Sequence, residues 1–170
     1  PGFTLGVMIR DFAAANPLVI ETDRLVLRPL RDTDATDLRR IVIIPEVGRM
    51  LLIFPPDWTE DAARAFTHTW RWKGDAMFRL AITRKGKDRL IGTIGIRRTP
   101  GEAEAAIFYF LDPAEAGNGF ALEVLTALLP ELARRFGPLP LVADVFTDNP
   151  PSARVLEKSG FIRTGTGMGT

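Results

Sequence analysis

Apolar and polar residues follow two different periods along the chain, and each period predicts one type of secondary structure. Residues 24–30 alternate apolar and polar side chains, which is typical of a half-buried strand. Residues 105–111 form a short apolar and aromatic run that ends at Asp112-Pro113, which predicts a buried strand. A long helix follows it, because apolar residues recur there at helical spacing. That apolar face consists of Leu122, Leu125, Leu129, Leu132 and Phe136.

Further elements complete the predicted order. Asp32 or Thr33 can cap a helix through about Val42, and Thr59 can cap a second helix over 60–72. Two strand-like runs, 77–83 and 89–96, flank the loop 84–88 as a hairpin. Residues 139–147 are predicted as another buried strand, 150–159 as a short helix that Gly160 ends, and 161–162 as the start of a last strand. We interpret the ambiguous segment 46–58 as rich in loops.

The order of these elements predicts the fold class. Strands joined by short turns usually pair antiparallel, whereas strand–helix–strand units usually pair parallel. The sequence therefore predicts an α/β (α+β) fold with a mixed central sheet and helices on both faces. The length of 170 residues suits one domain with a sizeable core. We expect a single domain over 1–170, with an irregular arm over 1–17 and a flexible tail over 165–170.

Composition excludes several classes of function. The 22 Lys and Arg residues nearly balance 21 Asp and Glu residues, so nucleic-acid binding has no electrostatic support. The absence of cysteine excludes disulfides, thiolate catalysis and zinc–thiolate sites, and the single histidine, His68, excludes a His-rich metal cluster. No metal site is predicted. No apolar run is long enough to span a membrane and no signal peptide is apparent, so we expect a cytoplasmic protein.

Two glycines, Gly117 and Gly119, lie in the turn between the predicted strand 105–111 and the long helix. The first N–H groups of a helix lack partners inside the helix, and glycine allows a ligand to approach that backbone closely. Phosphate or pyrophosphate is the ligand that such a site favours. A tight turn without a ligand explains the glycines as well. A dinucleotide-binding turn is a weaker alternative, because the full G-x-G-x-x-G pattern is absent.

The order of elements and three stretches of sequence resemble the GNAT (GCN5-related N-acetyltransferase) superfamily, in particular the RimJ/RimL-like branch of ribosomal-protein N-terminal acetyltransferases. The stretch "ETDRLVLRPLRDTDA" resembles the opening strand and helix, and "LIGTIGI" resembles a central hairpin strand. The stretches "AGNGFALEVLTALL" and "DNPPSARVLEKSGF" resemble the two cofactor-binding segments. The resemblance covers residues 20–164, and the order N-x-x-S-x-x-V-L-E-K-x-G-F is its most specific part.

The resemblance implies acetyl-CoA as cosubstrate and an amine as acceptor, either a protein N-terminus or a small molecule. Backbone amides of residues 117–121 would hold the pyrophosphate, and Asn149 would hydrogen-bond the pantetheine arm, although a helix cap alone also explains Asn149. Ala116 replaces the Gln or Arg that usually opens the family's turn. The implied cofactor-binding residues are Leu111, Gly117, Asn118, Gly119, Phe120, Ala121, Asn149 and Ser152.

Catalysis is less clearly marked in the sequence. By resemblance, Ser152 donates a proton to the leaving thiolate; the alternative is a first-turn serine bonded to the backbone. Backbone N–H groups around residues 109–111 would hold the thioester carbonyl. Many relatives carry a glutamate base where Ala106 lies here, and Glu104 on the same strand face is a candidate; a solvated charge is the alternative. Four aromatic residues wall the acceptor site or serve packing alone: Trp58, Phe66, Trp70 and Trp72.

The departures at Ala106 and Ala116 leave a second hypothesis open, a catalytically impaired acyl-CoA-binding module of the same fold. The resemblance gives no nucleic-acid or membrane partner and is compatible with a homodimer. Relatives carry one more strand after the segment that here ends at 161–164. We therefore expect that this strand is absent from the sequence given or comes from another molecule, since an unpaired strand edge is unfavourable.

Overall fold

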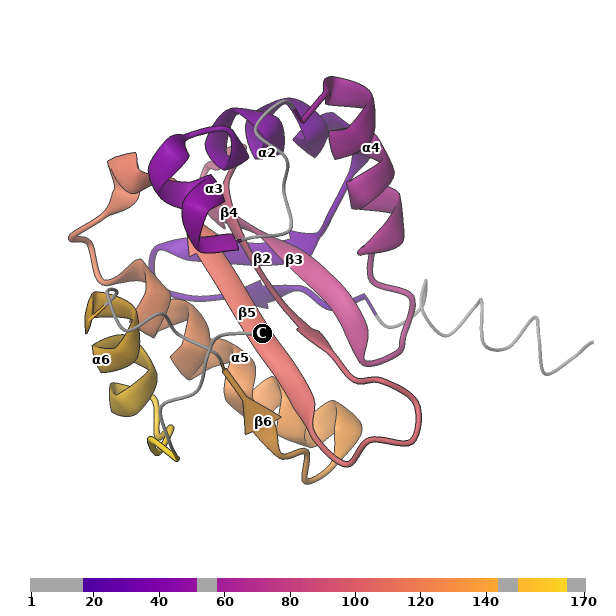
Figure 1. The fold of residues 1–170 in the computed structure, drawn as a ribbon, viewed down its shortest axis with the longest axis vertical. Coiled ribbons are helices and arrows are strands. Elements are labelled where there is room, and N and C mark those ends of the chain that lie inside the picture. Colours follow the sequence, from indigo (N-terminus) through magenta and orange to yellow (C-terminus); the bar gives the residue numbers. More distant parts are fainter. Residues whose placement is uncertain (1–16, 52–57, 144–149, 165–170) are drawn as a thin grey trace, which may run out of the picture.

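The protein is organised around one six-stranded sheet. A computed structural model of the chain describes residues 17–51, 58–143 and 150–164. The strands lie in the order in which they occur in the sequence (Figure 1). Each is antiparallel to the one before it, except that β6 runs parallel to β5. The strands are β1 (Ile20–Glu21), β2 (Leu25–Pro29), β3 (Met77–Arg84), β4 (Lys87–Arg97), β5 (Ala105–Leu111) and β6 (Leu141–Val142).

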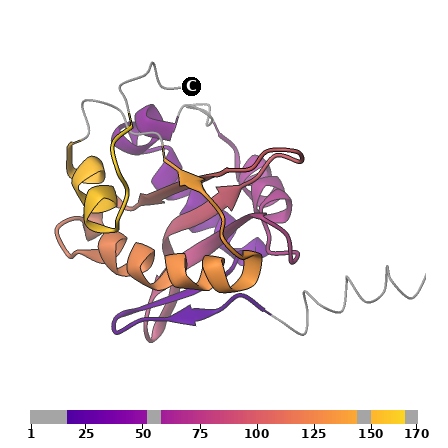
Figure 2. The ribbon, with the colours of Figure 1, turned by 90° about the horizontal axis from the view of Figure 1, so that it is seen from below.

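Helices cover both faces of this sheet. The helices α2 (Ala35–Val42), α3 (Pro45–Leu51) and α4 (Glu60–Thr69) share one hydrophobic core with one face. The helices α5 (Phe120–Phe136) and α6 (Pro150–Lys158) share a second core with the other face. Figure 2 shows α5 running along one side of the sheet, with α2 and α3 on the opposite side. The predicted mixed sheet with helices on both faces is confirmed.

Two short 3₁₀ turns lead into the helices, η1 (Asp32–Asp34) before α2 and η2 (Pro113–Glu115) before α5. Asp32 and Thr33 were predicted as caps for α2, but no side-chain cap bond is found at its start. Asp34 orders this turn instead, because its carboxylate accepts the backbone N–H of Arg31 at 2.7 Å. The helix therefore begins one short turn later than the capping pattern suggested.

The period of two along each strand divides the side chains between the two cores. On β3, Leu80 and Ile82 pack toward α5, whereas Ala81 packs toward α2 and α4. On β5, Ile107 belongs to the core under α5 and Phe110 to the core under α4. Neighbouring residues of β5 therefore serve opposite faces of the sheet.

Several predicted boundaries agree with the structure. The strand β5 has the predicted bounds. Thr59 caps α4, since its hydroxyl accepts the N–H of Ala62 at 3.1 Å, and the helix ends at Thr69, short of the predicted end at Trp72. The hairpin of β3 and β4 is confirmed with a tighter turn than predicted. Arg84 pairs with Lys87, and Gly86 adopts a φ of +80° that suits glycine.

Two segments differ from the prediction. Residues 46–58 were interpreted as rich in loops, but α3 occupies their first part because Val47 packs into the core under α2. Residues 161–164 form no strand, although Phe161 and Ile162 were predicted to begin one. Ile162 is 85% exposed, so it gains none of the burial that would favour a strand there. The two apolar residues after Gly160 therefore do not indicate a strand, and this prediction was wrong.

The helix α5 continues without a break through Pro130 and ends before Gly137, whose φ is +71°. Of the five apolar residues predicted to face the core, Leu125 and Leu132 are buried and the other three are half-buried. Val124 and Leu128 are buried as well, so the apolar stripe is wider than the predicted one.

Other expectations fall partly outside the described residues. These are the arm over 1–16, the tail over 165–170 and residues 144–147 of a predicted strand, of which β6 is the described part. Across the three described ranges, no helix combines the length and apolarity that crossing a bilayer requires. The same ranges contain no cluster of three or more His, Asp or Glu residues arranged to hold a metal ion.

Candidate active site

The glycine turn before α5 adopts a conformation that needs glycine at two positions. Gly117 has a φ of +83°, and Gly119, the N-cap of α5, has φ +75° and ψ +17°. Residues other than glycine rarely adopt this left-handed backbone conformation, because their Cβ atom comes too close to the following carbonyl oxygen. No atom would lie within 4 Å of a Cβ on Gly117, so backbone conformation and not crowding explains this glycine.

This turn presents a series of backbone N–H groups for which the described part of the chain offers no acceptor. The N–H of Ala116 donates to Pro113 and that of Glu123 donates to Gly119 within α5. Between them, the structure gives no acceptor among the described residues for the N–H groups of residues 117–122. These donors lie at the positive end of a helix of 17 residues. Their arrangement fits a bound anion, because an oxyanion can accept several of these N–H groups at once.

A cavity of about 430 Å³ opens beside these N–H groups. Five of the predicted cofactor-binding residues line it: Leu111, Gly117, Gly119, Phe120 and Ala121. Asn118 is not among the lining residues, and its side chain donates instead to the carbonyl of Glu115 at 3.0 Å. The end of β5 and the start of α5 therefore contribute to one concave site.

The helix α6 supplies the opposite wall of the cavity and two positive charges. Arg154 and Lys158 line it, and both side chains are exposed. No ion pair involving either one is found within the described residues, whereas the carboxylate of Glu115 at the rim is paired with Arg84. The site therefore favours a polyanion such as a pyrophosphate. The predictions from sequence assign neither residue a role in binding; their spacing of four residues, which places both charges on one face of a helix, was the available signal.

Two carboxylates hold the turn in place. Asp112, directly after β5, accepts the N–H of Ala114 at 3.0 Å and a bond from Arg40 at 2.8 Å. Burial raises the pKa of Asp112, but these hydrogen bonds outweigh it and keep that pKa below the ordinary value. Glu123, in the first turn of α5, accepts hydrogen bonds from Thr22 at 2.5 Å and from Nε of Arg24 at 2.8 Å. The turn is thereby fixed to the opposite end of the sheet.

Phe120 packs the start of α5 against the sheet. Phe120 lines the cavity, although the residue as a whole is only 2% exposed. The guanidinium groups of Arg24 and Arg84 lie 4.6 Å and 4.9 Å from its ring centroid. Such cation–π contacts contribute about 0.5–1 kcal/mol each where they are exposed. The predicted role of Phe120 in cofactor binding stays a prediction, with its N–H group as the candidate donor.

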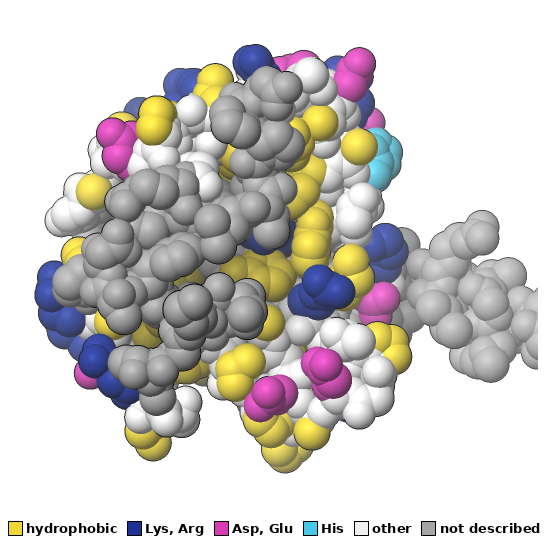
Figure 3. Space-filling model, in the orientation of Figure 1, with side chains coloured by type: hydrophobic (Ala, Val, Ile, Leu, Met, Phe, Trp, Pro, Cys, Tyr) yellow, Lys and Arg dark blue, Asp and Glu magenta, His cyan; other side chains and the backbone are white. Residues whose placement is uncertain are grey.

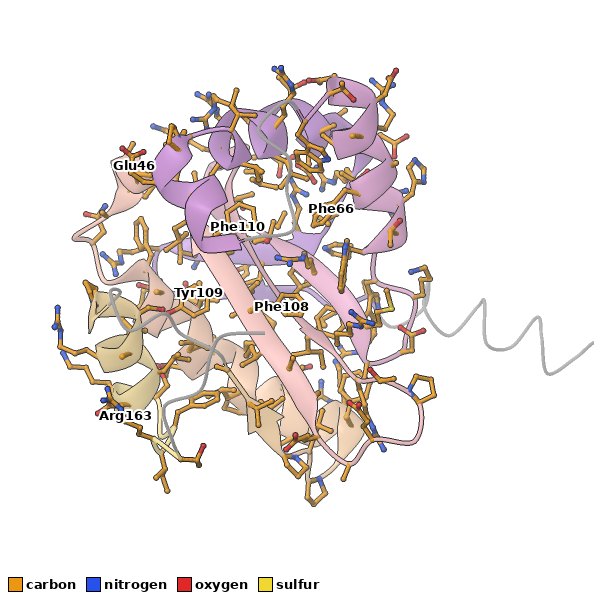
Figure 4. The ribbon with its side chains drawn as sticks, viewed as in Figure 1. Glu46, Phe66, Phe108, Tyr109, Phe110 and Arg163 are labelled. Atoms are coloured by element: carbon orange, nitrogen blue, oxygen red, sulfur yellow. The ribbon has the colours of Figure 1, made fainter. Side chains whose placement is uncertain are left out.

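Ser152, the predicted proton donor, hydrogen-bonds to Tyr109. The Tyr109 hydroxyl and the Ser152 hydroxyl are 2.9 Å apart, which joins β5 to α6. Figure 4 shows Tyr109 on β5, pointing toward α6. Burial raises the pKa of Tyr109 above its ordinary value of 10.0, and the bond to Ser152 opposes part of this rise. Tyr109 therefore keeps its proton at neutral pH.

The edge of β5 next to Tyr109 is the predicted place for the thioester carbonyl. The described part of β6 pairs only with Ala105 and Ala106, and the N–H of Ala105 donates to Pro140 at 2.9 Å. Residues 109–111 lie further along β5, beyond this short pairing with β6. The arrangement is compatible with a backbone donor at this edge, which stays a prediction.

The remaining predicted site residues are placed as follows. Glu104 is exposed and lies just before β5, and no hydrogen bond or ion pair of its side chain is found within the described residues. Its role as a base stays a prediction. Asn149 lies outside the described residues. The cavity lining includes Pro151 but neither Ser152 nor Tyr109, so the role of Ser152 as proton donor stays a prediction.

The four aromatic residues predicted to wall the acceptor site divide between the two faces. Trp58 and Phe66 pack edge-to-face with ring centroids 5.5 Å apart, and Trp70 contacts Phe66 and Phe108. These residues lie on the α4 face. Trp72 belongs to the opposite core under α5, where its ring packs against Phe78 with centroids 5.0 Å apart. Trp72 therefore serves packing in the α5 core.

Known proteins resemble this chain in sequence and in fold. Residues 24–162 match the family described as Acetyltransferase (GNAT) domain. The uncharacterized N-acetyltransferase YoaA of Bacillus subtilis (strain 168) is 33% identical over 149 residues, which cover 86% of this chain and 84% of YoaA.

Two solved structures share the fold. A GNAT-family acetyltransferase from Bacillus anthracis has a TM-score of 0.74 at 24% identity, with 87% of this chain and 86% of that chain covered. Mycobacterium smegmatis RimJ in complex with CoA-disulfide has a TM-score of 0.73 at 20% identity, with 88% and 78% covered. The structural likeness extends over most of each chain, and the sequence match spans both the glycine turn and α6. This chain belongs to the GNAT family of acetyltransferases.

Proposed function

We propose that this acetyltransferase uses acetyl-CoA as cosubstrate and transfers the acetyl group to an amine. The observation that carries this proposal is the run of N–H groups over 117–122, which have no acceptor among the described residues and lie beside a cavity of about 430 Å³ between α5 and α6. Pyrophosphate is the anion of coenzyme A that needs such a site. The CoA-disulfide bound to Mycobacterium smegmatis RimJ supports a coenzyme A ligand on this fold. We place the chain in the RimJ/RimL-like branch on this likeness and on its sequence motifs.

The residues around the cavity contribute to binding in different ways. The N–H groups at Gly117, Gly119 and Ala121 hold the pyrophosphate oxygens, and Arg154 and Lys158 balance their charge. Asp112 and Glu123 contribute indirectly, because they fix both ends of the turn. Asn149 is assigned to the pantetheine arm by its place in the sequence.

Acetyl-CoA supplies an acetyl group already activated as a thioester. The chain must polarise the carbonyl, give a proton to the departing sulfur and accept one from the amine. A backbone N–H at the edge of β5 serves the first need. For the second, the proton that Tyr109 retains can pass along its hydrogen bond to Ser152. Glu104 is the candidate acceptor of the amine proton.

Replacement of Gly119 by valine tests the binding site. Gly119→Val should weaken acetyl-CoA binding at least ~10-fold, because a branched side chain at φ +75° distorts the N–H groups that face the cavity. Gly101→Val is the matched control, because Gly101 has a φ of +91° and lies in the loop before β5, outside the cavity lining. Both variants should lose about 1–2 kcal/mol of stability from the strained backbone.

Titration calorimetry on the folded proteins measures the affinities. Only Gly119→Val should lose affinity, and acetyl-CoA but not NADH should raise the melting temperature of the parent protein. Equal affinities for the Gly119→Val and Gly101→Val variants would show that the turn is purely structural. Stabilisation by NADH and not by acetyl-CoA would refute the cosubstrate.

Removal of the paired hydroxyls tests the proton donor. Ser152→Ala and Tyr109→Phe should each lower kcat by about 10²- to 10⁴-fold, the range for one acid–base group, and leave acetyl-CoA affinity unchanged. The double variant should be no slower than the worse single variant, since both hydroxyls act in one relay. Release of the CoA thiol in the presence of amines reports turnover. If kcat is unchanged in both single variants, under conditions where chemistry is rate-limiting, the two hydroxyls have no part in the mechanism.

The same assay on the parent protein tests the hypothesis of a catalytically impaired module. Thiol release above the rate of hydrolysis contradicts that hypothesis.

A further inference from the structure

Arg79 is a buried positive charge without a negative partner among the described residues. It lies on β3, on the face covered by α4, and is 2% exposed. Its Nη1 donates to the hydroxyl of Thr93 at 3.1 Å, and its Nε has no acceptor within the described residues. No carboxylate among those residues forms an ion pair with it. Burial lowers the pKa of Arg79 to about 9, so it still carries its charge at neutral pH.

Three aromatic rings surround the guanidinium of Arg79. Its Cζ lies 4.1 Å from the ring centroid of Phe108, 5.1 Å from that of Trp70 and 5.2 Å from that of Phe66. Each of the three rings is only half-buried, so the cage is not closed within the core. Figure 4 shows that Phe66 from α4 and Phe108 from β5 lie over the same face. Figure 3 shows a strip of hydrophobic side chains on this face with Lys and Arg side chains beside it.

Gly95 allows Arg79 to extend across the sheet toward β5. The strand registers place Arg79, Gly95 and Phe108 in one row across β3, β4 and β5. A Cβ atom on Gly95 would lie 2.7 Å from Cγ of Arg79 and 2.1 Å from the carbonyl oxygen of Phe78. The aliphatic stem of Arg79 therefore lies where a side chain of β4 would otherwise be. Its charged end reaches Phe108 on β5, although its backbone belongs to β3.

This position relates Arg79 to the proposed chemistry. The carbonyl site is assigned to the edge of β5 beyond its pairing with β6, and Tyr109 serves the α6 side of the same strand. Phe108 points to the α4 side, next to Tyr109 in the sequence. An acceptor that approaches from the α4 side thus meets the aromatic cage and its buried charge next to the strand at which its amine must react.

Because this argument rests on the proposed acetyl transfer, it concerns the acceptor of that reaction. We propose that Arg79 binds the carboxylate of the acceptor, so that the acceptor is a small amine that also carries a carboxylate, such as an amino acid. Among the described residues, neither Nε nor Nη2 of Arg79 has an acceptor, and this edge of the guanidinium matches the two oxygens of a carboxylate. A single guanidinium balances the single charge of a carboxylate, whereas a phosphate dianion would need more. Because Arg79 is buried, a ligand reaches this edge only if one of the half-buried rings rotates.

Matched pairs of acceptors test the proposal on the intact protein. The probes are the standard α-amino acids and their carboxamides, which keep the amine and the side chain but lack the negative charge. Thiol release from acetyl-CoA is measured for each, and rates are compared per concentration of unprotonated amine. For the best acceptor, kcat/KM of the amino acid should exceed that of its carboxamide by about 10- to 100-fold, the range for a hydrogen-bonded contact between charged groups.

The variant Arg79→Met separates selectivity from other effects. It should bring this ratio close to one by raising KM for the amino acid, while KM for acetyl-CoA stays unchanged. Arg79→Lys should retain part of the ratio, since it keeps the charge and loses the fork. Arg64→Met is the control, because Arg64 is an exposed arginine of α4, the helix that also provides Phe66 and Thr67. It should keep the full ratio.

The outcomes distinguish the inference from the proposed function. Thiol release with carboxamides as good as that with amino acids, or an unchanged ratio in folded Arg79→Met, would overturn the role of Arg79 and leave the acetyltransferase activity standing. Absence of transfer to every amine, including peptide N-termini, would overturn the proposed function itself. If Arg79→Met does not fold, the comparison of amino acids with carboxamides on the parent protein decides the inference alone.

Discussion

Arg28 and Arg79 are two buried arginines on neighbouring strands, and they differ in the partners of their guanidinium groups. Arg28 on β2 is 5% exposed and Arg79 on β3 is 2% exposed. Arg28 forms a bidentate pair with Asp34, at 2.8 Å and 2.9 Å, and its Nε donates to Asp88 at 2.8 Å. Its two remaining N–H groups donate to the carbonyls of Pro29 and Asp88. All five donors of Arg28 are therefore used, whereas the side chain of Arg79 makes one hydrogen bond to the described residues, to Thr93.

The pKa values reflect this difference. Burial lowers the pKa of Arg28, but the hydrogen bonds and charges of Asp34 and Asp88 outweigh it and raise that pKa above its ordinary value. Burial acts alone on Arg79 and lowers its pKa. Cation–π contacts offset part of the desolvation of Arg79, at about 0.5–2 kcal/mol for each ring. They supply no hydrogen-bond acceptor, so the donors of Arg79 stay available to a ligand.

The comparison shows how to separate a structural charge from a functional one. A buried charge with all its donors satisfied stabilises one arrangement of the chain, because any loss of a partner is costly. A buried charge with donors left over is a cost to folding unless something else accepts those donors. Arg28 belongs to the first kind, since it joins β2, η1 and the start of β4. Arg79 belongs to the second.

The largest expected effect is on stability, and it comes from Arg28. Arg28→Met should destabilise the protein by about 3–5 kcal/mol, because it leaves the carboxylate of Asp34 buried without its partner. Arg79→Met should change stability by no more than about 1 kcal/mol, because it removes a desolvated charge together with its cation–π contacts. Urea unfolding at neutral pH measures both. Similar losses in the two variants would mean that the aromatic cage is a structural element, and the distinction would fail.

Much of the fold was predictable from the sequence because its signals are local. The bounds of β5 follow from one apolar run that a proline ends, and the start of α4 follows from the hydroxyl of Thr59. The glycine turn was found for the same reason, since residues near in sequence form it. The local φ angles of Gly117 and Gly119 agree with the requirement for glycine at both positions.

The rest depends on contacts between distant residues. Arg79 occupies a polar position in an alternating strand, and nothing nearby shows that Phe66, Trp70 and Phe108 surround it. The pairing of Tyr109 with Ser152 joins residues 43 apart in the sequence. Phe161 illustrates the opposite error. Two adjacent apolar residues, Phe161 and Ile162, suggested a strand, but residues 161–164 do not form one. Periodicity gives the face on which a side chain lies but not the partner that it meets there.

The smallest expected effect concerns Asp88, the exposed partner of Arg28. The hydrogen bond from Arg28 holds the pKa of Asp88 below its ordinary value of 3.8. A carboxyl group whose pKa is lower in the folded state contributes stability at neutral pH, and that contribution is lost as the pH falls through the folded pKa. Because the side chain of Asp88 is 63% exposed, solvent screening limits its contribution to about 0.2–1 kcal/mol.

Unfolding of the parent and of Asp88→Asn, measured from pH 7 down to about pH 2, tests this expectation. The parent should be more stable near neutral pH, and the difference should shrink toward the acid end. Asp61→Asn is the control for loss of a surface carboxylate, since the side chain of Asp61 is 94% exposed. The stability difference between the parent and Arg79→Met should stay constant over the same range, because no described carboxylate pairs with Arg79. If the stability difference between the parent and Arg79→Met changes as the pH falls, Arg79 has a carboxylate partner. It would then resemble Arg28.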